Sequence, residues 1–437
     1  MPFAPPSSPV VQLALDFLNL EPALRCAHEA EPAGLQWVEA GTPLIKSVGL
    51  EAVRRLRAEF PHAVVVADMK VMDAGRTEVE AAKKSGADLV MVLAAASDAT
   101  IQECVATGRH LGVAIGCDLV NCTDPVARAK RCEELGADLV SVHTPIDVQM
   151  TGADSFAHLA AVASAVRIPV ACAGGISPAT APRAVAAGAR VIIVGGAITK
   201  APDPRAALAA LNAALATGQV SAEEAGRYRR LGLDEIRKVL EKVSTPNLSD
   251  AMHRGGGLHG LVSRNPAKRL CGPAFTVLTA PGDWAKPVQA IDEAKPGDVL
   301  VIDAGDDYPA MWGGLASLTA VQRGLGGVII RGACRDLADL VSSGLALWST
   351  KTCADAGEPR GLGCFGIPLT IGDQSIRPGD WLVGDEDGLV VIPAAQVVEV
   401  ANRAADVNER ETRLAAEIRA GHSLSTLAEL KRWEQHR

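Results

Sequence analysis

Aromatic residues are scarce in this chain of 437 residues, and several features that would point to a compartment or partner are missing. Phe, Trp and Tyr make up 3% of the residues, so a core must be built mainly from Ala, Val, Leu and Ile. No apolar run reaches the about 20 residues that a membrane-spanning helix needs. The first residues carry neither the basic segment nor the apolar stretch of a secretory signal. We therefore expect a cytoplasmic protein with no membrane partner.

An excess of basic over acidic residues is lacking too, as are closely paired cysteines. The net charge is −8, which argues against nucleic acid as a partner. None of the ten cysteines forms a CxxC pair, so their spacing argues against a zinc site and favours small, buried hydrophobic side chains. At roughly 150 residues per domain, the length predicts two or three domains.

Apolar segments typical of buried strands recur through the first half, with helical patterns between them. The phrase GADLV at 86–90 returns at 136–140, where each glycine can end a helix before the next strand. Eight such units in about 200 residues predict a (β/α)8 TIM barrel over residues 1–215, with a doubly wound open sheet as the alternative. The predicted strands are residues 11–17, 34–39, 63–68, 87–93, 112–119, 137–143, 168–173 and 190–195.

Six ionisable side chains stand at or just beyond the predicted C-terminal ends of four strands, the rim where barrel enzymes carry their chemistry. Three of them form a D-x-K-x-x-D run after the third strand. Grouping such charges is costly unless they hold a substrate or a metal, although a solvated ion-pair cluster is the alternative. The six residues are Asp16, Glu39, Asp68, Lys70, Asp73 and His143.

Glycine-rich turns follow the last two predicted strands. They contain Gly174 with Gly175, and Gly195 with Gly196, and both lead towards helices. Backbone N–H groups in such turns can approach an anion, and a helix N-terminus adds favourable dipole charge. One Gly-Gly pair would be only a turn, but two pairs in these positions predict a phosphate ester.

The second half has a different pattern and is predicted to be a separate domain, residues 233–437, after a linker at 216–232. Strands are expected at 274–280, 298–304, 327–332 and 381–393, the last with a hairpin turn at 385–388. A helix is expected at 308–323, and residues 244–250 supply caps and a turn. The tail from residue 394 is expected to be mostly charged helix.

Five residues of this half form a second candidate site. Gly313 and Gly314 stand near a helix start, where backbone N–H groups can bind a carboxylate. Arg335 suits a bidentate grip on a carboxylate, and Asp336 and Asp339 could hold a magnesium ion through water. A surface ion pair with a helix cap is the alternative.

Residues 10–210 resemble 3-hexulose-6-phosphate synthases, within the orotidine-monophosphate decarboxylase superfamily. The resemblance rests on residues 14–16, 38–46 and 143–149, the D-x-K-x-x-D run and both glycine turns. It implies a reversible aldol condensation of formaldehyde with the phosphosugar ribulose 5-phosphate.

The resemblance also implies roles for the residues at the rim. Glu39 and Asp68 would hold magnesium or manganese, and His143 would transfer a proton. Lys70 would stabilise negative oxygen, held in place by Asp16 and Asp73. Related 3-keto-gulonate-6-phosphate decarboxylases usually carry an arginine where this chain has Ile146, so decarboxylase chemistry is the alternative.

Residues 235–395 resemble the family shared by ribonuclease-activity regulator A and the 4-hydroxy-4-methyl-2-oxoglutarate/4-carboxy-4-hydroxy-2-oxoadipate aldolases. The aldolase signature G-x20-R-D-x2-D/E fits Gly314, Arg335, Asp336 and Asp339. The resemblance implies a swivelling β/β/α-type domain, assembled as a homo-oligomer, that is a metal-dependent aldolase or decarboxylase of a 2-oxo acid. The alternative is a non-catalytic regulatory or oligomerisation module.

Overall fold

The computed structural model describes residues 6–152, 156, 158–218, 230–305, 307–428 and 430, and the predicted linker lies largely outside them. The chain forms two compact units. The first comprises Met1–Gln149, Ala153–Arg230 and Glu409–Arg437, and the second comprises Met150–Gly152 and Leu231–Asn408. None of the described helices combines the length and the apolarity that a membrane crossing requires.

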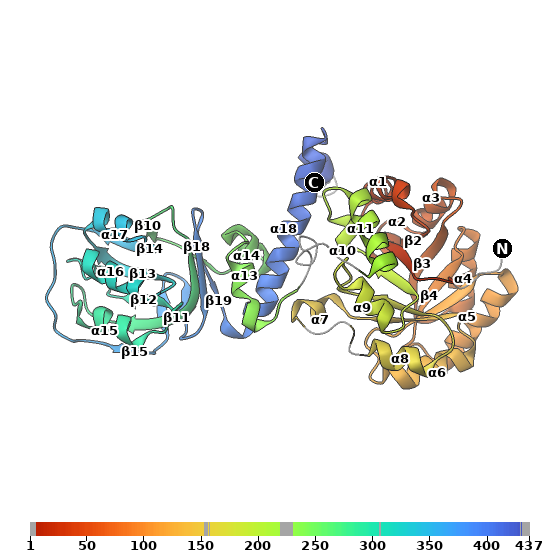
Figure 1. Ribbon diagram of the computed structural model, residues 1–437, viewed down its shortest axis with the longest axis horizontal. Coiled ribbons are helices and arrows are strands. Elements are labelled where there is room, and N and C mark those ends of the chain that lie inside the picture. The colour runs from red at the N-terminus through yellow and green to blue at the C-terminus, as the bar shows by residue number, and fades with distance from the viewer. Residues whose placement is uncertain are drawn as a thin grey trace, which may run out of the picture. The chain divides into compact units, whose positions relative to one another are not determined.

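Eight parallel strands close into a barrel in the first unit, so the predicted TIM barrel is confirmed (Figure 1). Each strand pairs with the next in chain order, and β8 pairs with β1. The strands are β1 Val10–Leu15, β2 Trp37–Ala40, β3 Val64–Val71, β4 Leu89–Leu93, β5 Ala114–Asp118, β6 Leu139–His143, β7 Val170–Ala173 and β8 Val191–Val194.

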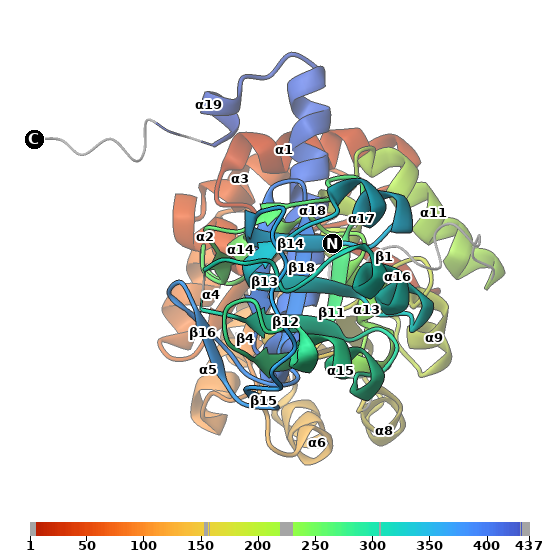
Figure 2. The same cartoon turned by 90° about the vertical axis from the view of Figure 1, so that its left-hand side faces the viewer.

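Helices surround the strands as a ring, which Figure 2 shows best. They are α1 Leu20–Ala30, η1 Glu31–Ala33, α2 Thr42–Val48, α3 Glu51–Glu59, α4 Gly75–Lys84, α5 Asp98–Leu111, α6 Pro125–Leu135, α7 Ile146–Met150, α8 Leu159–Ala165, α9 Ala181–Ala186, α10 Gly196–Thr199 and α11 Pro204–Thr217.

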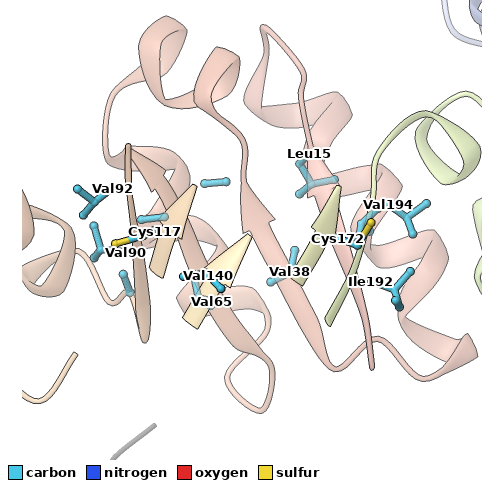
Figure 3. Packing of buried hydrophobic residues seen from close by; sticks show 14 of the residues in the cluster. Leu15, Val38, Val65, Val90, Val92, Cys117, Val140, Cys172, Ile192 and Val194 are labelled. Carbon is cyan, nitrogen blue, oxygen red and sulfur yellow. The ribbon is translucent and has the colours of Figure 1, made fainter. Parts of the chain in front are cut away.

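Aliphatic side chains fill the barrel on both sides of its wall. One buried cluster lies between strands and helices, and Figure 3 shows Leu15, Val38 and Val194 of this cluster on the neighbouring strands β1, β2 and β8. A second cluster, which includes Val66 and Leu139, comes from the strands alone. Burying each such side chain contributes about 1.5–3 kcal/mol, so the wall that carries the rim is well supported.

The repeated GADLV phrase fixes the end of the barrel opposite the rim. Its first residues, Gly86 and Gly136, have φ of 102° and 96°, a backbone region that glycine enters without strain. The aspartates that follow accept hydrogen bonds from the preceding strand, Asp88 from Val65 N at 2.9 Å and Asp138 from Ile115 N at 2.8 Å. The phrase is therefore a strand-entry device and not part of the site.

The second unit is a separate sheet-and-helix domain, as predicted. Its main sheet runs in the order β10-β14-β13-β12-β11-β18-β19-β9, with β15 paired to β11 and a small β16-β17 hairpin apart. The strands are β9 Gly257–Leu258, β10 Val262–Ser263, β11 Leu270–Leu278, β12 Val299–Asp303, β13 Gly327–Cys334, β14 Leu347–Thr352, β15 Cys364–Phe365, β16 Leu369–Ile371, β17 Gln374–Ile376, β18 Trp381–Asp385 and β19 Gly388–Ile392.

Helices of the second half depart from the expected pattern in two places. Residues 244–250, expected as caps and a turn, form a helix, because Ser244 and Asn247 make a reciprocal capping box. The helix expected from residue 308 begins only at Gly314, because 310 and 312 are drawn into bridges with Ala356 and Cys334. The helices are η2 Leu233–Glu235, α13 Arg237–Leu240, α14 Thr245–Ala251, α15 Ala285–Glu293, α16 Gly314–Gln322, α17 Leu337–Ser343, η3 Ala394–Gln396, α18 Val397–Arg419 and α19 Leu424–Leu427.

Candidate functional site

Glu39 lies at the base of the barrel rim. It points from β2 into a buried position, only 5% exposed, where its carboxylate accepts a hydrogen bond from Gln12 Nε2 of β1. Burial raises the pKa of Glu39 well above its ordinary value, and the charges of Asp68 and Asp16 add to the rise. The contact with Gln12 and the charge of Lys70 oppose the rise without cancelling it.

Asp16 follows β1 and stands between two glycine turns. A Cβ built on Gly41 would overlap its Oδ1, and one on Gly195 would lie 3.5 Å from its Oδ2. The carboxylate can be reached from solvent at the open rim, yet chain atoms surround it on its other sides. This burial raises the pKa of Asp16, as does the charge of Asp68.

A four-residue network occupies the centre of the rim. Lys70 Nζ donates to Asp68 Oδ2 at 2.8 Å and to Asp118 Oδ2 at 2.9 Å. The same Asp118 oxygen lies 3.0 Å from His143 Nδ1. One carboxylate thus fixes both the ammonium group and the imidazole.

Charge pairing outweighs burial in this network. Burial alone would raise the pKa of Asp118, but His143 and Lys70 lower it to about 2. Burial would likewise lower the pKa of Lys70, but Asp68 and Asp118 raise it above the ordinary value. An ionised Asp118 can only accept hydrogen bonds, so His143 Nδ1 carries a proton, and in a neutral imidazole Nε2 would then be the acceptor.

The backbone of β3 is bent where it presents Lys70. The register between β3 and β4 shifts between Ala67 and Val71, and Lys70 has a φ of 47°. A non-glycine residue in this region carries backbone strain. Thr42 steadies the strand there, donating to both the carbonyl and the carboxylate of Asp68, at 2.8 and 2.7 Å.

The partners of Lys70 differ from the expected pair. Asp16 acts on Lys70 only through its charge. Asp73 is exposed near Glu78, whose pKa is raised by burial and by the charge of Asp73. Sequence reasoning missed Asp118, because the predicted fifth strand was extended to residue 119 and hid the last residue of the true strand. The same rule that selected the other rim residues, a polar side chain at a strand end, would have found it.

The predicted glycine cradle lies on the same rim. Gly174 and Gly175 have φ of 95° and 68°, and a Cβ on Gly174 would collide with Thr144 O and Gln149 Nε2. A Cβ on Gly196 would lie 3.2 Å from Nζ of Lys200, a cation that sequence reasoning did not select. The ammonium group of Lys200 and the turn at Gly195 and Gly196 therefore lie close to Asp16.

An open pocket on the neighbouring part of the rim does not offer an equivalent anion site. It lies between the loops after β4 and β5 and has a volume of about 600 Å³. Both of its arginines are engaged by one carboxylate, with Arg128 2.6 Å and Arg131 2.8 Å from Asp98. This pocket therefore gives no reason to move the predicted phosphate site away from the glycine turns.

The acids at the base of the rim have the chemistry of a divalent-cation site. Two of them, Asp16 and Glu39, have raised pKa values because burial disfavours their charged forms and the charge of Asp68 adds to that effect. Among the described residues no three acid, histidine or cysteine side chains are gathered into a metal cage. Magnesium commonly needs only one or two carboxylates, with substrate and water supplying the rest, so Glu39 and Asp68 fit such an ion.

The second candidate site comes together in the other unit. Gly314 N donates to Asp336 Oδ2 at 3.2 Å, and Arg335 Nε lies 3.6 Å from the same oxygen. A Cβ on Gly314 would press on Asp339. All five predicted residues thus converge where α16 and α17 begin, although Asp336 is already occupied by internal partners.

The fold and the rim together define a (β/α)8-barrel enzyme joined to a separate sheet-and-helix domain. Residues 9–211 match the sequence model of the Orotidine 5'-phosphate decarboxylase / HUMPS family, and residues 245–391 match that of the RraA-like Aldolase/RraA family.

Named relatives cover the first half of the chain. The 3-hexulose-6-phosphate synthase of Bacillus subtilis is 39% identical over 194 residues, 44% of this chain and 92% of that protein. The synthase of Mycobacterium gastri is 40% identical over 207 residues, 47% of this chain and 99% of that protein. A crystal structure of a 3-hexulose-6-phosphate synthase is 40% identical and covers 47% of this chain and 98% of that one, with a TM-score of 0.45.

The chain therefore belongs to the orotidine 5'-phosphate decarboxylase/HUMPS family through its barrel, and its second domain is RraA-like. The prediction of an enzyme of the aldehyde-lyase class is confirmed, as are both resemblances on which it was based.

Proposed function

We propose that the barrel joins formaldehyde to ribulose 5-phosphate, reversibly, to give a 3-hexulose 6-phosphate. The observation that carries this proposal is the double engagement of Asp118, which bonds Lys70 at 2.9 Å and His143 at 3.0 Å beside the glycine cradle. An aldol condensation of this kind needs a proton acceptor and a fixed positive charge close together.

Each residue of the network has a distinct task in this reaction. The glycine cradle and Lys200 bind the phosphate of the sugar. His143 Nε2 takes the proton from C1, with the imidazole oriented by Asp118. Lys70 stabilises the negative oxygen of the enediolate, and C1 then attacks the carbon of formaldehyde. The aldehyde oxygen becomes an alkoxide, which takes back the proton held by His143. In the reverse direction the same groups release formaldehyde.

Glu39 and Asp68 would hold magnesium or manganese. When bound, such an ion supplies a Lewis acid for the sugar oxygens. The raised pKa of Glu39 supports this assignment, since a bound cation would offset the cost of burying the charged carboxylate.

Formaldehyde consumption with ribulose 5-phosphate by the full chain tests the proposal. We expect metal-dependent turnover that EDTA removes, that added magnesium restores, and that Asp68→Ala abolishes. Asp88→Ala is the matched control, because Asp88 bonds Val65 N at the opposite end of the same strand. Turnover that is indifferent to EDTA, or equal in the two variants, contradicts the proposed chemistry.

Decarboxylation of a keto-sugar acid phosphate is the alternative for the barrel. Release of carbon dioxide from 3-keto-gulonate 6-phosphate would identify it. The position where the decarboxylases usually carry an arginine is held here by Ile146, whose side chain is 53% exposed. An isoleucine offers no positive charge, which favours the synthase reaction.

For the second domain we propose a metal-dependent cleavage of a 4-hydroxy-2-oxo acid. The contact of Gly314 N with Asp336 and the adjacent Arg335 support this, because they place an acid suited to a metal next to a guanidinium suited to a carboxylated substrate. The full chain should release pyruvate in the presence of magnesium. Asp336→Ala should remove this activity, whereas Asp292→Ala, which breaks only a surface pair with Arg323, should not.

Inactivity in that assay would favour the regulatory or oligomerisation module. Such a role would draw support from exposed apolar side chains on two neighbouring helices of the second unit. They are Leu315, Leu318 and Val321 on α16, and Leu337 and Val341 on α17. We propose that a second copy of the chain covers this apolar face.

A further inference from the structure

Asn402 is a fully buried amide in the second turn of α18. Its Nδ2 donates to Met150 O at 2.8 Å and to Leu231 O at 3.0 Å, and its Oδ1 accepts from Leu231 N at 3.0 Å. A helix needs no asparagine at a buried position, where alanine or leucine is more favourable. The amide instead joins Met150 and Leu231, which are far apart in sequence, by hydrogen bonds that no apolar residue could make.

One of these segments comes from the barrel sequence. Met150 is the last residue of α7, in the connection that follows β6. Met150–Gly152 nevertheless belongs to the same compact unit as Asn402 and Leu231. Gly152 has a φ of 75°, and a Cβ built on it would lie 2.9 Å from Leu231 O. Asn402 therefore bridges Met150 to Leu231, and Gly152 packs directly against the carbonyl of Leu231.

The other end of α7 reaches the proposed active site. His143 is the last residue of β6, and the next residue, Thr144, accepts a hydrogen bond from Gln149 Nε2 at 2.8 Å. A Cβ built on Gly174 would lie 2.8 Å from that same Gln149 nitrogen. Gln149, whose side chain packs on the glycine cradle, thus directly precedes Met150, whose carbonyl Asn402 holds.

We propose that Asn402 is a positioning residue for the barrel reaction. By holding the carbonyl of Met150, it fixes α7 and keeps Gln149 against Gly174 before the substrate arrives. A loop that is already ordered binds a phosphate ester without the loss of affinity that ordering it would cause. Asn402 therefore acts on the barrel reaction through Met150 and the residue before it, Gln149, whether or not the second unit is itself catalytic. This inference rests on the proposed synthase function.

Two variants of the full chain disturb the contact of Met150–Gly152 with Asn402 and Leu231 in different ways. Asn402→Ala removes the amide, and Gly152→Ala leaves α18 intact but crowds Leu231. Asn212→Ala is the control for the first, because Asn212 donates to Ala33 O at 3.0 Å on another helix. Gly112→Ala is the control for the second, because Gly112 has a similar φ of 69° and open space around it.

Steady-state kinetics with ribulose 5-phosphate and hydrogen exchange of residues 144–152 provide the readouts. Loss of the Met150 contact in Asn402→Ala, or its displacement in Gly152→Ala, should raise KM about tenfold, with kcat changed much less. Exchange at 144–152 should be faster without substrate. Both controls should change neither quantity.

Equal KM values in variants and controls, or unchanged exchange at 144–152, would overturn the inference. If Asn402→Ala does not fold, Gly152→Ala decides alone. If the wild-type chain makes no hexulose phosphate, the proposed function fails. The inference is then tested by hydrogen exchange at 144–152, which should be faster in the two variants. It is tested also by the affinity for inorganic phosphate, which both variants should lower.

Discussion

The two candidate sites of this chain are built in opposite ways. In the barrel, Asp118 and Asp68 have side chains only 3% and 10% exposed, and both are bonded to Lys70. In the second unit, Arg335 and Asp336 are 41% and 39% exposed and lie 3.6 Å apart. The barrel thus encloses its charges with its own strands, whereas the other site lies open at the surface.

Burial explains why the two sites differ electrostatically. Burial at the rim, together with neighbouring acids, raises the pKa values of Glu39 and Asp16, whereas His143 and Lys70 lower that of Asp118. Water screens the pair in the second unit, where such an interaction is worth little by itself. We infer that the barrel site is organised by one chain. The second site would be enclosed only when a second copy of the chain covers the apolar face beside it.

Asp118→Asn should have the largest effect and tests the enclosed site most directly. The substitution keeps the shape but removes the charge that fixes Lys70 and His143. We expect kcat/KM for ribulose 5-phosphate and formaldehyde to fall about 10³-fold, within the range of a lost general acid–base function. Pyruvate release by the second unit should stay unchanged, which would separate the two sites.

Asp138→Asn is the matched control, because Asp138 bonds Ile115 N at the far end of the barrel. Its kinetics should equal those of the unaltered chain. A similar loss in both variants would mean that the effect of Asp118→Asn comes from the barrel fold and not from the site.

Most of the fold could be predicted from the sequence, because the barrel repeats one simple pattern. The eight strands, the helix-ending glycines and the hairpin at 385–388 follow from local preferences. One error was local, since the capping box of Ser244 and Asn247 begins a helix where a turn was expected. The other arose where distant contacts decide the structure. Residues 310 and 312 lie in bridges to Ala356 and Cys334, so the expected start of that helix was wrong. No local pattern announces such bridges.

The contents of the sites were predictable, but their internal bonding was not. Convergence of Asp16, Glu39, Asp68, Lys70 and His143 follows from the closed barrel alone. The partners of Lys70 depend on the bend in β3 and on where β5 ends, and neither is visible in a single sequence. Asn402 lies about 260 residues beyond His143 and belongs to no motif, so only its contacts reveal it.

Glu39→Gln should have a moderate effect with opposite signs on stability and activity. Because folding raises its pKa, Glu39 destabilises the fold as pH rises from about 4.5 through the raised pKa. The amide removes that cost and can still accept from Gln12. We expect Tm at pH 7 to rise, by about 2–4 °C per kcal/mol gained, while metal-dependent turnover is lost.

The pH dependence provides the check on this assignment. Thermal unfolding of the unaltered barrel should become less favourable as pH falls from 7 towards 4.5, and this slope should be reduced in Glu39→Gln. Asp118 acts in the opposite sense, with its stabilisation lost only between about 3.8 and about 2. Magnesium should raise the Tm of the unaltered chain and not that of Glu39→Gln. Equal Tm values and slopes in both proteins would count against a buried, ionised Glu39.

Leu315→Ser should have the smallest effect on the folded chain and tests the open site. Leu315 is 84% exposed on α16, so its loss should change the free energy of unfolding by no more than about 0.5 kcal/mol. If a second copy covers the apolar face, sedimentation should show smaller species at equal concentration, with barrel kinetics unaltered. Leu424→Ser, at a 58% exposed position on α19, is the control and should leave assembly unchanged. Identical sedimentation of both variants and the unaltered chain would show that this face takes no part in assembly, and the second site would then have to work uncovered.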